Sequence, residues 1–286
     1  MKPKIQAFFD PETSTVSYLV SDPASRRAVI IDPVLNFDPK AARTSTFSAD
    51  ALLTAVKSSG LEVDWILETH AHADHLSAAP YIKAATGAKV AIGEYIREVQ
   101  KVFAPIFGAQ DVTGDGAPFD RLLKDGETLV VGEMEVAVMN TPGHTPACVS
   151  YRIADNIFVG DTLFMPDYGT ARADFPGGNA HALYRSIRRI LEHPEHTNLW
   201  MCHDYRPPGR DTPAWHSTVG EERAKNIHVH DGISEDAFVA LRTARDRTLA
   251  MPVLILPSVQ VNIRAGHMPP QDMNGQVYLR LPVDAL

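Results

Sequence analysis

One short segment limits what this chain can fold into. Residues 69–75 read Thr-His-Ala-His-Ala-Asp-His, so three histidines and one aspartate lie within six consecutive positions. The segment follows an apolar run at 65–69 that has the length of a buried strand, and it precedes a predicted helix. If the loop keeps strand geometry, His70 and His72 project to the same side, and the last two residues of the segment begin the helix. Because so many imidazoles suit neither a core nor a turn, the segment predicts a metal site.

Three later segments place one more histidine or aspartate after a short apolar strand. The expected strands are 135–139, 157–159 and 198–201, and the side chains that follow them are, in order, His144, Asp161 and His203. A rigid scaffold presents functional side chains on the loops at its edge, so we expect all of these groups to meet in one cleft. Imidazole and carboxylate ligands suit zinc, iron or manganese better than a soft copper site. A metal binds neutral imidazole and ionised carboxylate, and these are the forms that histidine and aspartate ordinarily have at pH 7.

The rest of the chain alternates between β-rich and helical patterns. Further strands are expected at 14–20, 27–31, 89–92, 128–131 and 149–153. Helices are expected at 48–59, 78–86, 94–103, 182–191, 215–227 and 235–247. The segment 38–47 is polar and irregular, and the Pro-punctuated tail at 253–286 is expected to wrap the body. This order predicts a single α+β domain, 1–286, in which two mixed sheets covered by helices form a core at about 5–205 and a C-terminal extension spans 206–286.

Composition excludes several classes of function. The 286 residues include 27 Lys and Arg against 35 Asp and Glu, a formal net charge of −8, so neither nucleic acid nor a membrane is expected as a partner. No apolar run reaches the roughly 18 residues of a transmembrane span, and the first residues do not resemble a secretory signal. The only cysteines, Cys148 and Cys202, fit packing in a reducing cytosol. We therefore expect a cytoplasmic protein.

The combined motif resembles the metallo-β-lactamase superfamily. Its members in this chain are, in sequence order, His70, His72, Asp74, His75, His144, Asp161 and His203. The resemblance covers about residues 5–205 and implies a four-layer αβ/βα sandwich, which agrees with the alternation of elements. Within the superfamily, six passages resemble the persulfide dioxygenases, namely 31–35, 69–75 with Ala73, 142–149, 172–175, 203–205 and 221–223.

The resemblance implies that glutathione persulfide is oxidised by O₂ and water to sulfite and glutathione. It assigns one Fe(II) per chain to three candidate catalytic residues, His70, His144 and Asp161. The other residues of the motif would surround this iron and orient its ligands, namely His72, Asp74, His75 and His203. In zinc hydrolases of the same fold these four are ligands of a two-metal site.

Two other functions stay open at this point. Hydroxyacylglutathione hydrolase (glyoxalase II), a binuclear zinc enzyme, shares the ligand set and the Glu-Glu-Arg segment at 221–223. The Ala78-Ala79 pair stands where that hydrolase usually has two glycines, which favours the dioxygenase. A non-catalytic sulfur-sensing protein would be expected to lack at least one ligand, and the sequence retains all of them.

Glutathione carries two carboxylates and one amine, so its site should contain cations and hydroxyl groups. By resemblance, Arg172 and Tyr205 lie at the mouth of the pocket and contact the tripeptide, and Arg172 can hold a carboxylate with two parallel hydrogen bonds. The alternatives are a surface ion pair between Arg172 and Asp174, and a core position for Tyr205. We also expect a homo-oligomer, a dimer or a tetramer. The tail could bring His267 back to the cleft.

Overall fold

The computed structural model describes residues 2–285, and two six-stranded sheets form its centre. In spatial order, the first sheet contains β1 (Lys4–Asp10), β2 (Thr15–Ser21), β3 (Arg27–Ile31), β6 (Glu62–Leu67), β8 (Lys89–Gly93) and β9 (Arg121–Leu123). The second sheet contains β10 (Thr128–Val131), β11 (Met134–Asn140), β12 (Val149–Ile153), β13 (Asn156–Phe158), β14 (Asn198–Trp200) and β15 (His216–Thr218). A small sheet has the order β5 (Arg43–Ser45), β4 (Val34–Asp38) and β7 (Leu76–Ser77).

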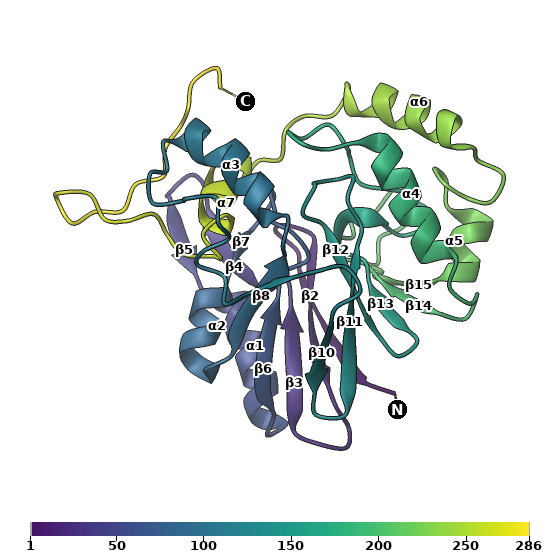
Figure 1. Cartoon of the computed structure of the whole chain (residues 1–286), viewed down its shortest axis with the longest axis horizontal. Coiled ribbons are helices and arrows are strands. Elements are labelled where there is room, and N and C mark those ends of the chain that lie inside the picture. The colour runs from purple at the N-terminus through teal and green to yellow at the C-terminus, as the bar shows by residue number, and fades with distance from the viewer. Residues whose placement is uncertain (1, 286) are drawn as a thin grey trace.

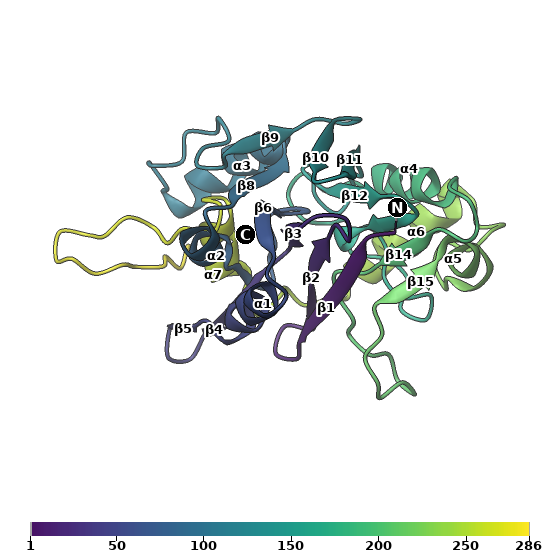
Figure 2. The same ribbon diagram turned by 90° about the horizontal axis from the view of Figure 1, so that it is seen from below.

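Helices cover the outer faces of the two sheets (Figures 1 and 2). Helices α1 (Phe47–Ser58) and α2 (Ala79–Thr86) pack on the first sheet through one apolar cluster. Helices α4 (Ala180–Leu191), α5 (Val219–Lys225) and α6 (Glu235–Asp246) cover the second sheet. Helices α3 (Ile96–Phe107) and α7 (Ile255–Asn262) share a further apolar cluster. The layers are therefore helix, sheet, sheet and helix, the metallo-β-lactamase fold that was expected.

The main core lies between the sheets, where side chains of both inner faces meet. Tyr18 and Ile31 from the first sheet share one cluster with Val136, Tyr151 and Phe158 from the second. In the first sheet, β3, β6, β8 and β9 pair in parallel, and parallel neighbours need a crossover connection. Helices α1, α2 and α3 lie in these crossovers. The carboxyl ends of the parallel strands therefore meet at one edge of the sheet, and the histidine-rich segment follows β6 at this edge.

Most expected elements are present, but the structure adds some strands and shifts other elements. Strands β1, β7 and β9 were not expected, and the segment taken as irregular contains part of β4 and all of β5. The helix expected at 215–227 begins late, because His216–Thr218 pairs with β14 as β15 and the Thr218 side chain then caps α5. Helix α7 lies in the tail, where Pro257 is tolerated because it falls in the first helical turn.

The helices are short. The longest have 12 residues, and among residues 2–285 no helix is long and apolar enough to cross a bilayer.

A buried acid lies where the second sheet meets α5. Glu222 is fully buried, and one of its carboxyl oxygens accepts a hydrogen bond from the Asn226 side chain at 2.7 Å. Burial raises the pKa of Glu222 from 4.5 to about 8, because the apolar surroundings disfavour the carboxylate. This residue belongs to the Glu-Glu-Arg segment, and its environment indicates a role in packing the extension against the sheet.

This buried acid predicts a pH dependence of stability. Between pH 4.5 and about 8 the folded chain keeps the Glu222 proton while the unfolded chain releases it. The contribution to stability is therefore complete below pH 4.5 and is lost as the pH rises, with a slope of about 1.4 kcal/mol per pH unit. The free energy of unfolding can be measured by urea titration at several pH values, after a chelator has removed any bound metal. In Glu222→Gln this pH-dependent slope should be absent. The exposed neighbour provides the control, because Glu221→Gln should keep the wild-type profile. Parallel profiles for wild type and Glu222→Gln would contradict this account.

Candidate metal centre

Every residue of the predicted motif lies in a loop that follows a strand. The segment with His70, His72, Asp74 and His75 connects β6 to β7. His144 follows β11, Asp161 lies in a short 3₁₀ turn after β13, and His203 follows β14. These loops come from both sheets and meet at one edge of the sandwich, where the strands before them end. The structure therefore brings all seven side chains together, as the sequence pattern indicates.

Three of these residues form one compact group. The ligand atoms of His70, His144 and Asp161 lie within 4.8 Å of one another, and all three residues are buried. His70 Nε2 and His144 Nε2 lie 3.8 and 3.7 Å from the same carboxylate oxygen of Asp161. We call these residues the first ligand group. Two imidazoles and one carboxylate are the ligand set of a facial triad.

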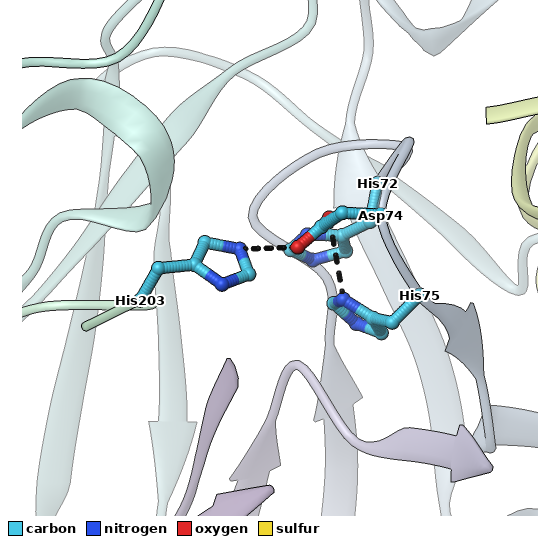
Figure 3. Close-up of side chains that lie close together, drawn as sticks. All are labelled: His72, Asp74, His75 and His203. Atoms are coloured by element: carbon cyan, nitrogen blue, oxygen red, sulfur yellow. Dashed lines mark ion pairs between the residues drawn. The ribbon is translucent and has the colours of Figure 1, made fainter. Parts of the chain in front are cut away.

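The other four residues form a second ligand group, shown in Figure 3. His203 approaches from one side and places Nε2 3.1 Å from Asp74, while His75 Nδ1 lies 3.5 Å from the other oxygen of the same carboxylate. His72 completes the group. Asp161 lies between the two groups, because its second oxygen is 3.4 Å from His203 Nε2.

Hydrogen bonds determine which ring nitrogens of the first ligand group are available. His144 Nδ1 lies 2.8 Å from the carbonyl oxygen of Arg172, which can only accept, so Nδ1 carries the proton. The Thr69 hydroxyl donates to Asp32 and therefore accepts from His70 Nδ1, at 3.0 Å. In both rings Nε2 keeps its lone pair and faces Asp161, as a metal ligand requires.

Several buried polar atoms of the centre lack hydrogen-bond partners among the described residues. They are His70 Nε2, His72 Nδ1 and Nε2, Asp74 Oδ2, His75 Nε2, Asp161 Oδ1 and His203 Nε2. Unpartnered buried polar atoms are costly, and a cation among them would offset this cost. The residues present therefore fit a metal ion with nitrogen and oxygen ligands, such as zinc, iron or manganese.

The ionisation of the centre also favours metal binding. Burial lowers the pKa of His70 and His72 well below the usual range, so both rings are neutral. Burial alone would raise the pKa of Asp74, but the neighbouring His203 and His75 rings bring it below its ordinary value. Burial raises the pKa of Asp161, which a bound cation would counteract.

Asp32 supports the histidine loop and was not among the predicted site residues. It has a φ of +49°, a backbone conformation that aspartate tolerates better than most residues. Its carboxylate accepts hydrogen bonds from the Thr69 N–H at 2.7 Å and the Thr69 hydroxyl at 2.9 Å, and one oxygen lies 3.1 Å from His72 Nε2. The sequence feature that could have indicated Asp32 is its position directly after a strand, in the run Ile31-Asp32-Pro33.

A cavity of about 520 Å³ reaches the centre, a size that suits a small-molecule ligand. Its wall includes His144 and Asp161 of the first ligand group. From the second group only Asp74 lines it, whereas His72, His75 and His203 are completely buried. The C-terminal extension contributes Arg242, Arg245 and most of the segment 249–254 to the wall.

Arg172 lines this cavity, but its guanidinium already has partners. Nε and Nη2 donate to the two carboxylate oxygens of Asp174 at 2.6 and 2.8 Å, and Nη1 donates to the Ala250 carbonyl oxygen at 2.7 Å. The ion pair that the sequence offered as the alternative is therefore present. Contact between Arg172 and a substrate stays a prediction.

Tyr205 lies at the cavity wall rather than in the core. Its ring stacks on His203, with centroids 5.3 Å apart and an interplanar angle of 14°, and the residue is 37% exposed. The expected contact with a tripeptide stays a prediction.

Two other residues left open by the sequence, Cys148 and His267, neither line the cavity nor belong to a ligand group. Cys148 is buried, and burial raises the pKa of its thiol to about 12, which disfavours the reactive thiolate. His267 is exposed, and its charged neighbours are Lys83 and Asp120. It neither lines the cavity nor joins a ligand group, so the tail does not bring it to the cleft.

Helix α7 holds the histidine loop from the far end of the sequence. Asn262 is buried, and its side-chain amide donates hydrogen bonds to the carbonyl oxygens of His72 and His75, both at 2.8 Å. Its carbonyl oxygen accepts the Ser77 N–H at 2.8 Å. Sequence reasoning missed Asn262, because nothing near it in the chain suggests a partner almost 190 positions away.

This protein is a metal-dependent enzyme. Its fold is an αβ/βα sandwich, and seven imidazole and carboxylate side chains cluster where strands of both sheets end. The chain belongs to the metallo-β-lactamase superfamily, whose family model matches residues 10–194.

Several known proteins resemble this chain along most of its length. A probable metallo-hydrolase of Burkholderia pseudomallei is 53% identical and covers 99% of both chains. Glyoxylase B2 of Dictyostelium discoideum is 47% identical over 100% of this chain and 98% of its own. The mitochondrial persulfide dioxygenase ETHE1 of Bos taurus is 31% identical over 93% and 90%. The crystal structure of ETHE1 from Myxococcus xanthus superposes with a TM-score of 0.74 at 30% identity, over 92% of this chain and 100% of that one.

The contacts of Asn262 predict a role in metal binding. Asn262→Ala should lower metal affinity by roughly 10- to 100-fold, the usual effect of removing a group that orients ligands. Competition with a chelator measures this change. Gln260→Ala is the matched control, because Gln260 is also a buried amide of α7 but bonds to the Leu256 and Arg280 carbonyl oxygens. An equal loss of affinity in both variants would show that Asn262 acts only through general stability.

Proposed function

We propose that the chain is an iron-dependent dioxygenase that converts glutathione persulfide, O₂ and water to glutathione, sulfite and two protons. The observation that carries this proposal is the position of the cavity. Its wall includes His144 and Asp161 of the first ligand group and, from the second group, Asp74 alone. A substrate in the cavity would therefore meet a centre of two histidines and one carboxylate.

In this proposal, His70, His144 and Asp161 hold one iron ion. When bound there, iron supplies the redox chemistry that zinc lacks and leaves positions free for the two reactants. The remaining contributions come from the chain. The Arg172 carbonyl oxygen and the Thr69 hydroxyl hold the His144 and His70 rings with Nε2 directed inward. The Phe164 and Phe175 side chains add apolar surface to the cavity wall.

A binuclear zinc hydrolase that acts on S-lactoylglutathione is the second candidate. The second ligand group and the position of Asp161 between the groups favour it, since two-metal hydrolases share such a carboxylate. The names of the relatives at 53% and 47% identity, a probable metallo-hydrolase and a glyoxylase, also favour hydrolysis over the persulfide dioxygenase at 31%. Both candidates take a glutathione derivative whose reacting group is attached to the cysteine sulfur.

Metal analysis combined with two assays separates these candidates. We expect one iron per chain in the purified protein, O₂ uptake with glutathione persulfide, and little hydrolysis of S-lactoylglutathione. Replacement of His70, His144 or Asp161 by Ala should abolish iron binding. His203→Ala should keep the iron and lose roughly 10- to 100-fold in activity, since it removes a neighbour of the centre rather than a ligand.

The opposite results would establish the hydrolase. Two zinc ions per chain in the wild type, one zinc ion in His203→Ala and rapid hydrolysis of the thioester would refute the dioxygenase. Absence of O₂ uptake by iron-loaded protein would refute it as well.

A further inference from the structure

The tail after α7 forms an arm that projects from the body. Residues 267–285 run outward and return as a narrow hairpin (Figures 1 and 2). At its turn the Asp272 N–H donates to the Gln276 carbonyl oxygen at 2.8 Å, and Gln271 lies opposite Val277 in an antiparallel bridge. Most residues of the arm are exposed. A two-stranded hairpin of this kind is marginally stable by itself, so we expect the arm to pair with a further strand.

The returning half of the arm has the alternating pattern of a half-buried β-strand. Apolar side chains occur at Val277, Leu279 and Leu281, with Tyr278 and Arg280 between them. Leu279 is half-buried, but Val277 is 42% and Leu281 75% exposed. Among residues 2–285, no strand pairs with the chain beyond Val277. The pattern therefore predicts a partner that the single chain does not supply.

The two edges of this segment differ in their hydrogen bonds. The Gln276 carbonyl oxygen bonds inside the hairpin, and the Arg280 N–H and C=O bond to the Gln260 side chain at 2.9 and 3.0 Å. In a strand, neighbouring residues direct their backbone groups to opposite edges. The odd-numbered residues from 277 to 281 therefore direct theirs away from these partners, and these groups make no hydrogen bond within residues 2–285. We call this side of the segment the outer edge.

The outer edge lacks the features that usually protect an exposed strand from pairing. Proteins commonly place lysine or proline on such edges. The segment 277–281 contains neither, and the Arg280 guanidinium is turned to the body, where it donates to the Phe107 and Gly108 carbonyl oxygens at 3.2 and 3.0 Å. Pro282 follows at an even position, so its missing N–H belongs to the other edge. The outer edge is therefore open to another strand.

Charge and symmetry favour a second copy of this chain as the partner. The chain has a formal net charge of −8, so two copies repel each other over much of their surface. The arm at 267–285 carries only two aspartates and one arginine, and two copies can approach there with little repulsion. An antiparallel pair of identical segments also has the two-fold symmetry that is commonest among homo-oligomers.

We propose that the outer edge pairs in antiparallel fashion with the outer edge of a second copy, about a two-fold axis at Leu279. This register places Val277 opposite Leu281, so apolar side chains meet apolar side chains. It also places Tyr278 opposite Arg280, a cation beside an aromatic ring, and no like charges lie opposite each other. The proposal does not depend on the reaction that the metal centre performs.

Leu279→Cys tests the register. In the proposed pair the two copies of residue 279 exchange backbone hydrogen bonds, which places their Cα atoms about 5.5 Å apart. A disulfide spans roughly 4.4–6.8 Å, so mild oxidation should link the two introduced thiols. Electrophoresis without reductant measures the linked dimer. The native Cys148 and Cys202 are buried and should not contribute. Val130→Cys is the matched control, because Val130 lies on the edge strand β10 and is 69% exposed, and it should give little linked dimer.

Leu281→Lys tests the affinity without a covalent link. The proposed dimer contains two Val277–Leu281 pairs, and their loss should raise the dissociation constant of the dimer by roughly 2- to 30-fold. Sedimentation equilibrium of the metal-loaded protein measures this change. Because residue 281 is exposed in the single chain, the circular dichroism spectrum should stay the same. Val130→Lys should leave the dissociation constant unchanged.

Three results would overturn the proposal. A wild type that stays monomeric at high concentration would mean that the outer edge is free or binds a different partner. A dimer with the same dissociation constant in the wild type and in Leu281→Lys would place the interface elsewhere on the chain. If Leu279→Cys forms no more linked dimer than Val130→Cys, the two arms do not pair at Leu279.

Discussion

Six buried imidazole and carboxylate side chains and the half-buried Asp74 lie together at one edge of the sandwich, and the rest of the structure depends on this fact. Removing such groups from water is costly unless each finds a partner. Seven of their atoms have no hydrogen-bond partner among the described residues. A bound cation offsets this cost, so folding of the loops and binding of the metal are coupled. The sandwich provides the geometry, because strands of both sheets end at this edge.

The backbone around the centre accepts unusual conformations to keep the loops together. Gly160 has a φ of +53°, and a Cβ at this position would lie 2.8 Å from the Thr69 side chain. The close approach of this glycine lets the loop carrying Asp161 pack against the start of the histidine loop. Asp32, also left-handed at a φ of +49°, binds the same threonine from the other side. Thr69 therefore connects the supports of both ligand groups, although it is not a ligand itself.

Much of the site could be predicted from the sequence because its signals are local. The density of His70–His75 after an apolar strand, and single ligands after three further strands, identified the centre without knowledge of the fold. Asn262 and the contact of Arg172 with the Ala250 carbonyl oxygen could not be found this way, because only tertiary packing brings these residues to their partners. Helix α7 was hidden by Pro257, whose helix-breaking tendency does not apply in the first turn. The homo-oligomer and the cytoplasmic location stay predictions.

The central claim is that the first ligand group holds a single metal ion. Anomalous diffraction tests it most directly, with data from crystals of the purified protein recorded on both sides of the iron and zinc absorption edges. Data of this kind identify the element and place it among the ligands without an activity assay. We expect one iron peak within ligand distance of His70, His144 and Asp161, and no metal peak among His72, Asp74, His75 and His203. Two zinc peaks, with Asp161 between them and His203 on the second, would contradict this account.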